Sequence, residues 1–152
     1  MRASVAFERY PDQAIVPNWC HHHFGLAAAT FAQHAFVYRP GAPAIWIVAS
    51  DADVPHDPLP ETVGLLVMRK APPRGKPTSV FLQRFGGAAT RNVYILGPDD
   101  AERFLRRETL TVVPVDDGRG YCVVRTADYV LGCGRVEGTS LISEVPRSWL
   151  GQ

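Results

Sequence analysis

The sequence predicts an α+β protein in two parts: a small N-terminal α/β half followed by a mixed β-barrel with one main helix. Three observations predict this. Before residue 87, helical segments alternate with apolar runs of strand length. After it, one clear helix is followed by closely spaced strands with short turns. Gly86-Gly87 separates the two patterns, so we expect an α/β domain over residues 1–86 and a β-barrel domain over residues 87–152.

The N-terminal half begins with a short helix over residues 17–25. Pro17 suits its first turn, and Gly25 suits a left-handed C-cap. The other elements expected here are a helical piece at 26–33, a strand pair at 35–39 and 44–49, a surface loop at 50–61, a buried strand at 62–69 and a short helix opened by residues 76–78.

The C-terminal half contains the clearest helix, which starts at residues 97–100. Proline in the first turn and two aspartates near the positive end of the helix dipole are strong start signals. Ala101, Phe104 and Leu105 are expected to face the core. The strands predicted around this helix are 91–96, 110–115, 121–125, 129–136 and 140–145.

Composition excludes several classes of protein. With 46% hydrophobic and 20% charged residues among 152, the chain is too apolar to be disordered. It has no apolar run of about 18 residues, so we expect no membrane partner, and its N-terminus carries no secretory signal pattern. Three cysteines do not make a disulfide framework. A cytoplasmic location is therefore expected.

Charge is distributed unevenly along the chain. The formal net charge is only +1, but residues 1–60 carry a net charge of −2 and the remainder carries +3. Between Glu61 and Asp99 there is no acidic residue, although six basic ones occur there. Arginine outnumbers lysine by 14 to 2, which suits phosphate recognition but also follows from a GC-rich genome. The acid-free interval favours a surface facing a polyanion, and a merely solvated face is the alternative.

Two sequence blocks resemble a known family. The first is Lys76-Pro-Thr-Ser-Val-Phe-Leu-Gln-Arg-Phe-Gly-Gly-Ala-Ala-Thr-Arg-Asn-Val93. The second consists of two segments, residues 120–135 and residues 143–148. Together they resemble the C-terminal RNA-binding region of the Sun-type RNA 5-methylcytosine methyltransferases, a PUA-like domain preceded by a pre-PUA α/β piece. Residues 23–31 and Ile45-Trp46-Ile47 resemble the pre-PUA piece.

The resemblance implies a compact module that binds structured RNA. In PUA domains, RNA lies against the first helix, the following strand and a neighbouring strand, which here would be residues 99–107, 110–115 and the strand before Pro146. Many PUA domains have glycine at the turn after that helix, whereas this chain has Arg107-Glu108. We therefore expect arginine side chains to carry the contact.

The sequence gives no sign of catalysis or of a cofactor. No glycine-rich loop lies between a strand and a helix, and no Gly-x-Ser-x-Gly elbow occurs. Cys20-His21-His22-His23 invites a zinc interpretation, but on a helix the three imidazoles point about 100° apart. We expect no metal site; a structural histidine cluster is favoured, with a proton-sensitive patch as the alternative.

Five further residues have two interpretations each. If Ala127-Asp128 is a two-residue turn, Cys122 and Cys133 lie opposite each other; reduced thiols are favoured over a bridge. Thr90 and Asn92 are interpreted as structural, with RNA contact as the alternative. Trp149 is expected to cap the barrel, with base stacking as the alternative.

We therefore predict a non-catalytic module for structured RNA, ribosomal or transfer RNA, that assists RNA modification or ribosome biogenesis. An enzyme of unrecognised type is a less favoured hypothesis than an RNA-binding module. The rival hypothesis is a protein-interaction adaptor that docks on an RNA methyltransferase in trans or on a ribosome-assembly factor. An exposed apolar patch on the barrel would favour the adaptor. The residues predicted to contact RNA are Arg69, Lys70, Arg74, Lys76, Arg84, Arg91, Arg103, Arg106, Arg107 and Arg147.

Overall fold

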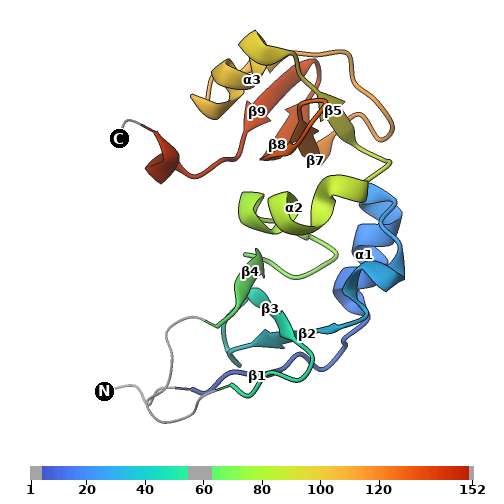
Figure 1. Cartoon of the computed structure of the whole chain (residues 1–152), viewed down its shortest axis with the longest axis vertical. Helices are drawn as coiled ribbons and strands as arrows, with labels where there is room; N and C mark the ends of the chain where they lie inside the picture. Colours follow the sequence, from blue (N-terminus) through green and yellow to red (C-terminus); the bar gives the residue numbers. More distant parts are fainter. Residues whose placement is uncertain (1–4, 55–62, 151–152) are drawn as a thin grey trace.

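The computed structural model describes residues 5–54 and 63–150, which form two sheets with helix α2 between them (Figure 1). The strands are β1 Glu8–Arg9, β2 His34–Tyr38, β3 Ile45–Ala49, β4 Leu65–Met68, β5 Val93–Ile95, β6 Leu110–Thr111, β7 Gly120–Arg125, β8 Val130–Glu137 and β9 Ser140–Ser143. The helices are α1 Ile15–Phe24, α2 Ser79–Phe85 and α3 Pro98–Leu105, with short 3₁₀ turns η1 Ala28–Phe31, η2 Gly86–Ala88 and η3 Arg147–Trp149. Among the described helices, none has the length and apolar character needed to cross a membrane.

The N-terminal sheet is antiparallel in the order β1-β2-β3-β4. The predicted hairpin and the C-cap are confirmed: β2 pairs with β3, and Gly25 is left-handed with φ of 68°. A side chain at Gly25 would meet Thr90 Oγ1 at 2.1 Å, so the position needs glycine for space as well as for conformation. Strand β1, two residues long, was not predicted. Most of the predicted loop at 50–61, and the start of the strand predicted at 62–69, fall on residues 55–62, outside the described residues.

The C-terminal sheet is mixed, in the order β5-β7-β8-β9-β6, with β5 and β7 parallel and the other pairs antiparallel. The predicted α+β fold class is confirmed: the sheet curls into a half barrel, and α3 begins at Pro98 as expected. Val115 N donates to the Tyr94 hydroxyl at 3.0 Å and so links the chain after β6 to β5 at the other edge. The strand predicted at 110–115 is shortened to β6. Pro114 has no N–H for a ladder, and the side chain of Val113 is 84% exposed.

Helix α2 packs on both sheets. One core cluster joins α1, α2 and the N-terminal sheet with Val123, Val130 and Cys133 of the C-terminal sheet, and Phe81 and Leu82 of α2 are fully buried in it. A second cluster lies between α3 and the C-terminal sheet. The division at residues 86–87 stays a prediction, because α2 belongs by sequence to the first part and contributes to a core shared by both.

The close approach of α2 to β8 depends on small residues. Ser79 Oγ accepts a hydrogen bond from Cys133 N at 2.9 Å, and Gln83 Nε2 donates to Leu131 O at 2.9 Å. A side chain at Gly132 would come within 2.8 Å of Ser79 Oγ. This contact fixes the N-terminal end of α2 against the C-terminal sheet, where the candidate site lies.

The predicted pairing of the cysteines is wrong by one residue. Cys122 lies opposite Gly134, and Cys133 lies opposite Val123, because the register shifts between Val124 and Arg125 before the turn. Side chains alternate between the two faces of a sheet, so the two thiols point into different core clusters. All three cysteines are free and buried, and burial raises the pKa of Cys20 and of Cys122 to about 12.

Candidate nucleic-acid interface

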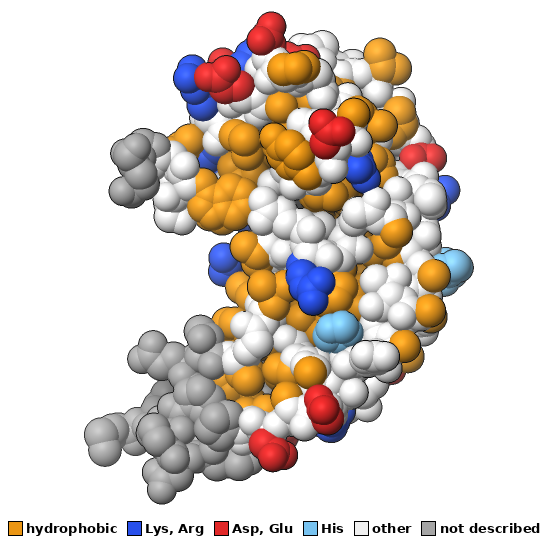
Figure 2. All heavy atoms as spheres, viewed as in Figure 1, with side chains coloured by type: hydrophobic (Ala, Val, Ile, Leu, Met, Phe, Trp, Pro, Cys, Tyr) orange, Lys and Arg blue, Asp and Glu red, His pale blue; other side chains and the backbone are white. Residues whose placement is uncertain are grey.

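A cleft of about 420 Å³ lies between the two halves of the molecule, next to the N-terminal end of α2. We call it the basic cleft; its polar and charged lining comprises Arg69, Lys76, Thr78, Ser79, Arg107, Tyr121, Glu144 and Ser148. The space-filling view shows the molecule hollowed on one side between its two ends, with basic side chains near this hollow (Figure 2). Residues far apart in the sequence therefore converge on one concave surface.

The loop between β4 and α2 brings Arg69 and Lys76 together. Arg69 N donates to Lys76 O at 3.0 Å, and Thr78 N donates to Val67 O at 2.9 Å. The two basic residues therefore lie side by side at the base of a turn. The Thr78 hydroxyl donates to Leu66 O at 2.6 Å and accepts from Phe81 N at 3.2 Å, which caps α2. The Lys-Pro-Thr block thus supplies a cation and fixes the helix behind it.

Arg107 enters the cleft from the end of α3. Glu108 N donates to Arg103 O at 3.0 Å and Arg107 N donates to Phe104 O at 2.9 Å, the bonding pattern of a Schellman helix end. In that motif the residue after the cap is left-handed and usually glycine, and Arg107 occupies it with φ of 66°. A left-handed conformation costs an L-residue roughly 1–2 kcal/mol. The Arg107 guanidinium donates to Val145 O.

The cleft is positively charged. In residues 5–54 and 63–150, no carboxylate lies within ion-pair distance of Arg69, Lys76 or Arg107. Glu144 is the acidic residue of the lining, and Arg135 Nε donates to its Oε1 at 3.0 Å. Burial, and then the charge of Glu144, raise the pKa of Tyr121, so this phenol is neutral at physiological pH. Such a surface suits a phosphate backbone.

Three predicted arginines are held in ion pairs elsewhere. Arg91 Nη2 lies 2.7 Å from Asp117 Oδ1, and Arg106 Nη2 lies 2.6 Å from Glu102 Oε1. Arg103 contacts carboxylates on both sides, at 3.3 and 3.5 Å. None of the three lines the basic cleft. Of the other predicted residues, Lys70, Arg74, Arg84 and Arg147 are exposed.

Asn92 is part of a structural junction. Its Nδ2 donates to His23 O at 2.7 Å and to Asp117 Oδ2 at 2.9 Å, and its backbone N donates to Asp116 Oδ2 at 2.8 Å. The side chain of Asn92 is buried, and the backbone N–H groups of Thr90 and Arg91 donate to Phe24 O. This block therefore ties the end of α1 to the β6–β7 loop, in agreement with the structural interpretation.

The charge of Asp117 is stabilised at this junction. The hydrogen bond from Asn92, with the nearby charges of Arg91 and His23, lowers the pKa of Asp117. His23 Nε2 lies 2.6 Å from Tyr121 O, and its ring stacks on Trp19 with centroids 4.6 Å apart. The described residues contain no group of three or more His, Cys, Asp or Glu placed to hold a metal ion.

Sequence reasoning missed a second concave surface on the C-terminal half. The Tyr129 side chain is 59% exposed, although the sequence placed it inside a strand. Trp149, expected as a cap, is 39% exposed and lines the same surface as Tyr129. The available signal was the position of Tyr129 directly after the turn residue Asp128, where a side chain need not follow the strand alternation.

The C-terminal half is similar to a known family. Residues 91–150 match the family described as the methyltransferase RsmF PUA domain. The match begins at Arg91 and includes the C-terminal sheet, α3 and η3. No curated protein matches the chain.

Proposed function

We propose that this chain is a non-catalytic module that binds structured RNA in its basic cleft, because residues 91–150 match the methyltransferase RsmF PUA domain. A PUA domain is an RNA-binding module, and the cleft combines PUA residues with cations from outside the match. Arg107 comes from within residues 91–150, whereas Arg69 and Lys76 precede them.

The main support for this proposal is that three cations without carboxylate partners in the described residues converge at one concave surface. Arg69, Lys76 and Arg107 come from two separate segments, and the fold places them around one cleft. Phosphate contacts from such groups give an affinity that depends on shape and salt more than on base sequence. This combination favours folded RNA over an unpaired strand, because Tyr121 is the single aromatic side chain of the cleft lining, whereas stacking of successive bases uses several rings.

We further propose that the RNA is ribosomal or transfer RNA and that it is bound in the cytoplasm. The kinship of the PUA part with an RNA-modifying family supports a role in RNA modification or ribosome biogenesis. In this proposal a separate RNA methyltransferase performs the chemistry. Crosslinking the chain to RNA in cells, followed by sequencing of the bound fragments, tests this; enrichment of messenger RNA alone would contradict it.

Binding itself is tested by fluorescence anisotropy with a labelled RNA stem-loop at low salt. The double variant Arg69→Ala/Lys76→Ala removes two cleft cations and should weaken binding at least tenfold. Each lost phosphate contact removes the favourable free energy of releasing about one counterion from the RNA. The matched control is Arg103→Ala/Arg106→Ala, which removes two predicted arginines that are already ion-paired. Equal losses in the two variants would contradict the cleft assignment, and no binding by the unmodified chain would refute the function.

The adaptor hypothesis gains support from a different observation. The C-terminal half carries an exposed apolar surface that includes Ile95, Tyr129 and Trp149, which is the feature expected of a protein-docking module. Both activities are compatible in one chain, because the apolar surface and the basic cleft are lined by different residues.

A further inference from the structure

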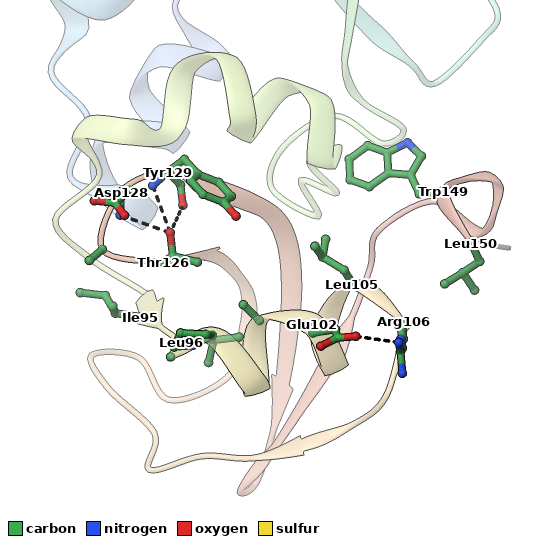
Figure 3. A pocket seen from close by; sticks show the side chains of 14 residues that line it. Ile95, Leu96, Glu102, Leu105, Arg106, Thr126, Asp128, Tyr129, Trp149 and Leu150 are labelled. Carbon is green, nitrogen blue, oxygen red and sulfur yellow. Dashed lines mark hydrogen bonds and ion pairs between the residues drawn. The ribbon is translucent and has the colours of Figure 1, made fainter. Parts of the chain in front are cut away.

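A groove of about 840 Å³ lies between α3, β5 and the β7–β8 turn (Figure 3). We call it the apolar groove; its larger apolar side chains are Ile95, Leu96, Leu105, Tyr129, Trp149 and Leu150. It borders the same C-terminal segment as the basic cleft, since Ser148 lines the cleft and Trp149 lines the groove. In the close-up view the rings of Tyr129 and Trp149 extend into the groove from separate segments.

The exposure of these side chains is built into the fold. Thr126 N donates to Tyr129 O at 2.9 Å, and Tyr129 N donates to Thr126 Oγ1 at 3.2 Å, so the turn that presents Tyr129 is fixed. Ile95 is 68% exposed although it lies on β5, a paired strand. Apolar side chains held in the open around a concave surface are typical of a binding site for another molecule.

The charges around the groove select the kind of partner. Arg106 is the basic residue of the lining, and Glu102 neutralises it at 2.6 Å. Asp128 also lines the groove and has no ion-pair partner among residues 5–54 and 63–150, which leaves a net charge of −1. A phosphate backbone is repelled by such a lining, in contrast to the basic cleft. Charge complementarity favours a ligand that is apolar and positively charged.

We propose that the apolar groove binds a segment of a partner protein whose apolar side chains are flanked by lysine or arginine. This surface is independent of RNA binding. The partner's apolar side chains contact Ile95, Tyr129 and Trp149, while its basic groups lie near Asp128. The chain then holds RNA in one concave surface and a protein in the other.

The test is an NMR titration of the whole ¹⁵N-labelled chain with synthetic peptides. One peptide contains leucine and phenylalanine flanked by lysines, a second has glutamate in place of each lysine, and an RNA oligonucleotide is the third probe. We expect the lysine peptide to shift the amide signals of Ile95, Tyr129 and Trp149 and to bind more tightly than the glutamate peptide. Equal binding by both peptides, or larger shifts at these residues with RNA, would overturn the proposal.

Variants separate the groove from non-specific apolar contact. Ile95→Ser/Tyr129→Ser removes two exposed contacts and should weaken lysine-peptide binding by about tenfold. The control is Val113→Ser, which removes an apolar side chain that is 84% exposed and lies outside the groove. Equal weakening by both would overturn the proposal, as would chromatography showing that the groove variant abolishes self-association of the unmodified chain. Loss of RNA affinity in the groove variant would also contradict it, whereas failure of RNA binding in every variant bears on the cleft alone.

Discussion

Raising the salt concentration fourfold, for example from about 50 to 200 mM, should weaken RNA binding by roughly 20- to 40-fold. The basis is the number of cations in the basic cleft: we expect Arg69, Lys76 and Arg107 to make three phosphate contacts. Each contact contributes about 0.7 to 0.9 to the slope of log affinity against log salt, so three give a slope between about −2 and −3.

The size of this salt effect distinguishes binding through the three cleft cations from binding through all ten basic residues that the sequence predicts. If all ten predicted basic residues contacted phosphate, the slope would lie between about −7 and −9, and the same salt change would cost about 10⁴- to 10⁵-fold. The structure reduces that number to three. Arg91, Arg103 and Arg106 are ion-paired and lie outside the cleft lining, which also excludes Lys70, Arg74, Arg84 and Arg147.

The assay is anisotropy of a labelled RNA stem-loop at five or more salt concentrations. Lys76→Ala should make the slope shallower by about 0.7 to 0.9, whereas Arg103→Ala should leave it unchanged. A slope of about −6 or steeper in the unmodified chain would refute the three-contact cleft. A slope near zero would show that charge does not drive the binding.

Three other changes test single features. Arg107→Gly removes the cost of a left-handed arginine but also removes its hydrogen bond to Val145 O. The free energy of unfolding, measured by urea denaturation, should therefore change by no more than about 1 kcal/mol, while RNA binds several-fold more weakly. A much larger loss of stability would contradict the Schellman assignment. Asp117 has a lowered pKa, so its contribution to stability is present at neutral pH and is lost as pH falls through its folded-state pKa; denaturation between pH 7 and 3 should show this loss, and Asp117→Asn should reduce it. Gly132→Ala places a methyl group 2.8 Å from Ser79 Oγ and should destabilise by about 1–3 kcal/mol; Gly87→Ala, in open space, is the control, and equal stability of the two variants would contradict the packing described for α2.

Local signals predicted the elements well. Pro98 with Asp99 and Asp100 marked the start of α3, and Gly25 marked the end of α1, because each residue satisfies a local backbone requirement that neighbours in sequence reveal. The register of β7 on β8 could not be predicted in this way. The irregularity after Val124 arises from the long-range pairing itself. A shift of one residue places Cys122 and Cys133 on opposite faces of the sheet, although the sequence predicted them as a directly opposed pair.

The candidate site was predicted as a list of cations and not as a surface. Arg69 and Lys76 were identified because no acidic residue lies near them in sequence. Arg91 looked equivalent by that criterion, but its partner Asp117 is 26 residues away. Spacing along the chain cannot reveal such a carboxylate, and only the fold distinguishes a cation free to contact phosphate from one already neutralised.

The two concave surfaces explain why a formal net charge of +1 says nothing about partners. The basic cleft carries three cations without carboxylate partners in the described residues, while the apolar groove carries an unpaired aspartate beside a neutralised arginine. The formal net charge adds these groups to every other charged residue of the chain, whereas each surface acts locally, because salt screens exposed charges beyond about 8–10 Å. An RNA and a basic protein segment would repel neither their own surface nor each other. The two partners can therefore bind at the same time, each held by the charges of its own surface.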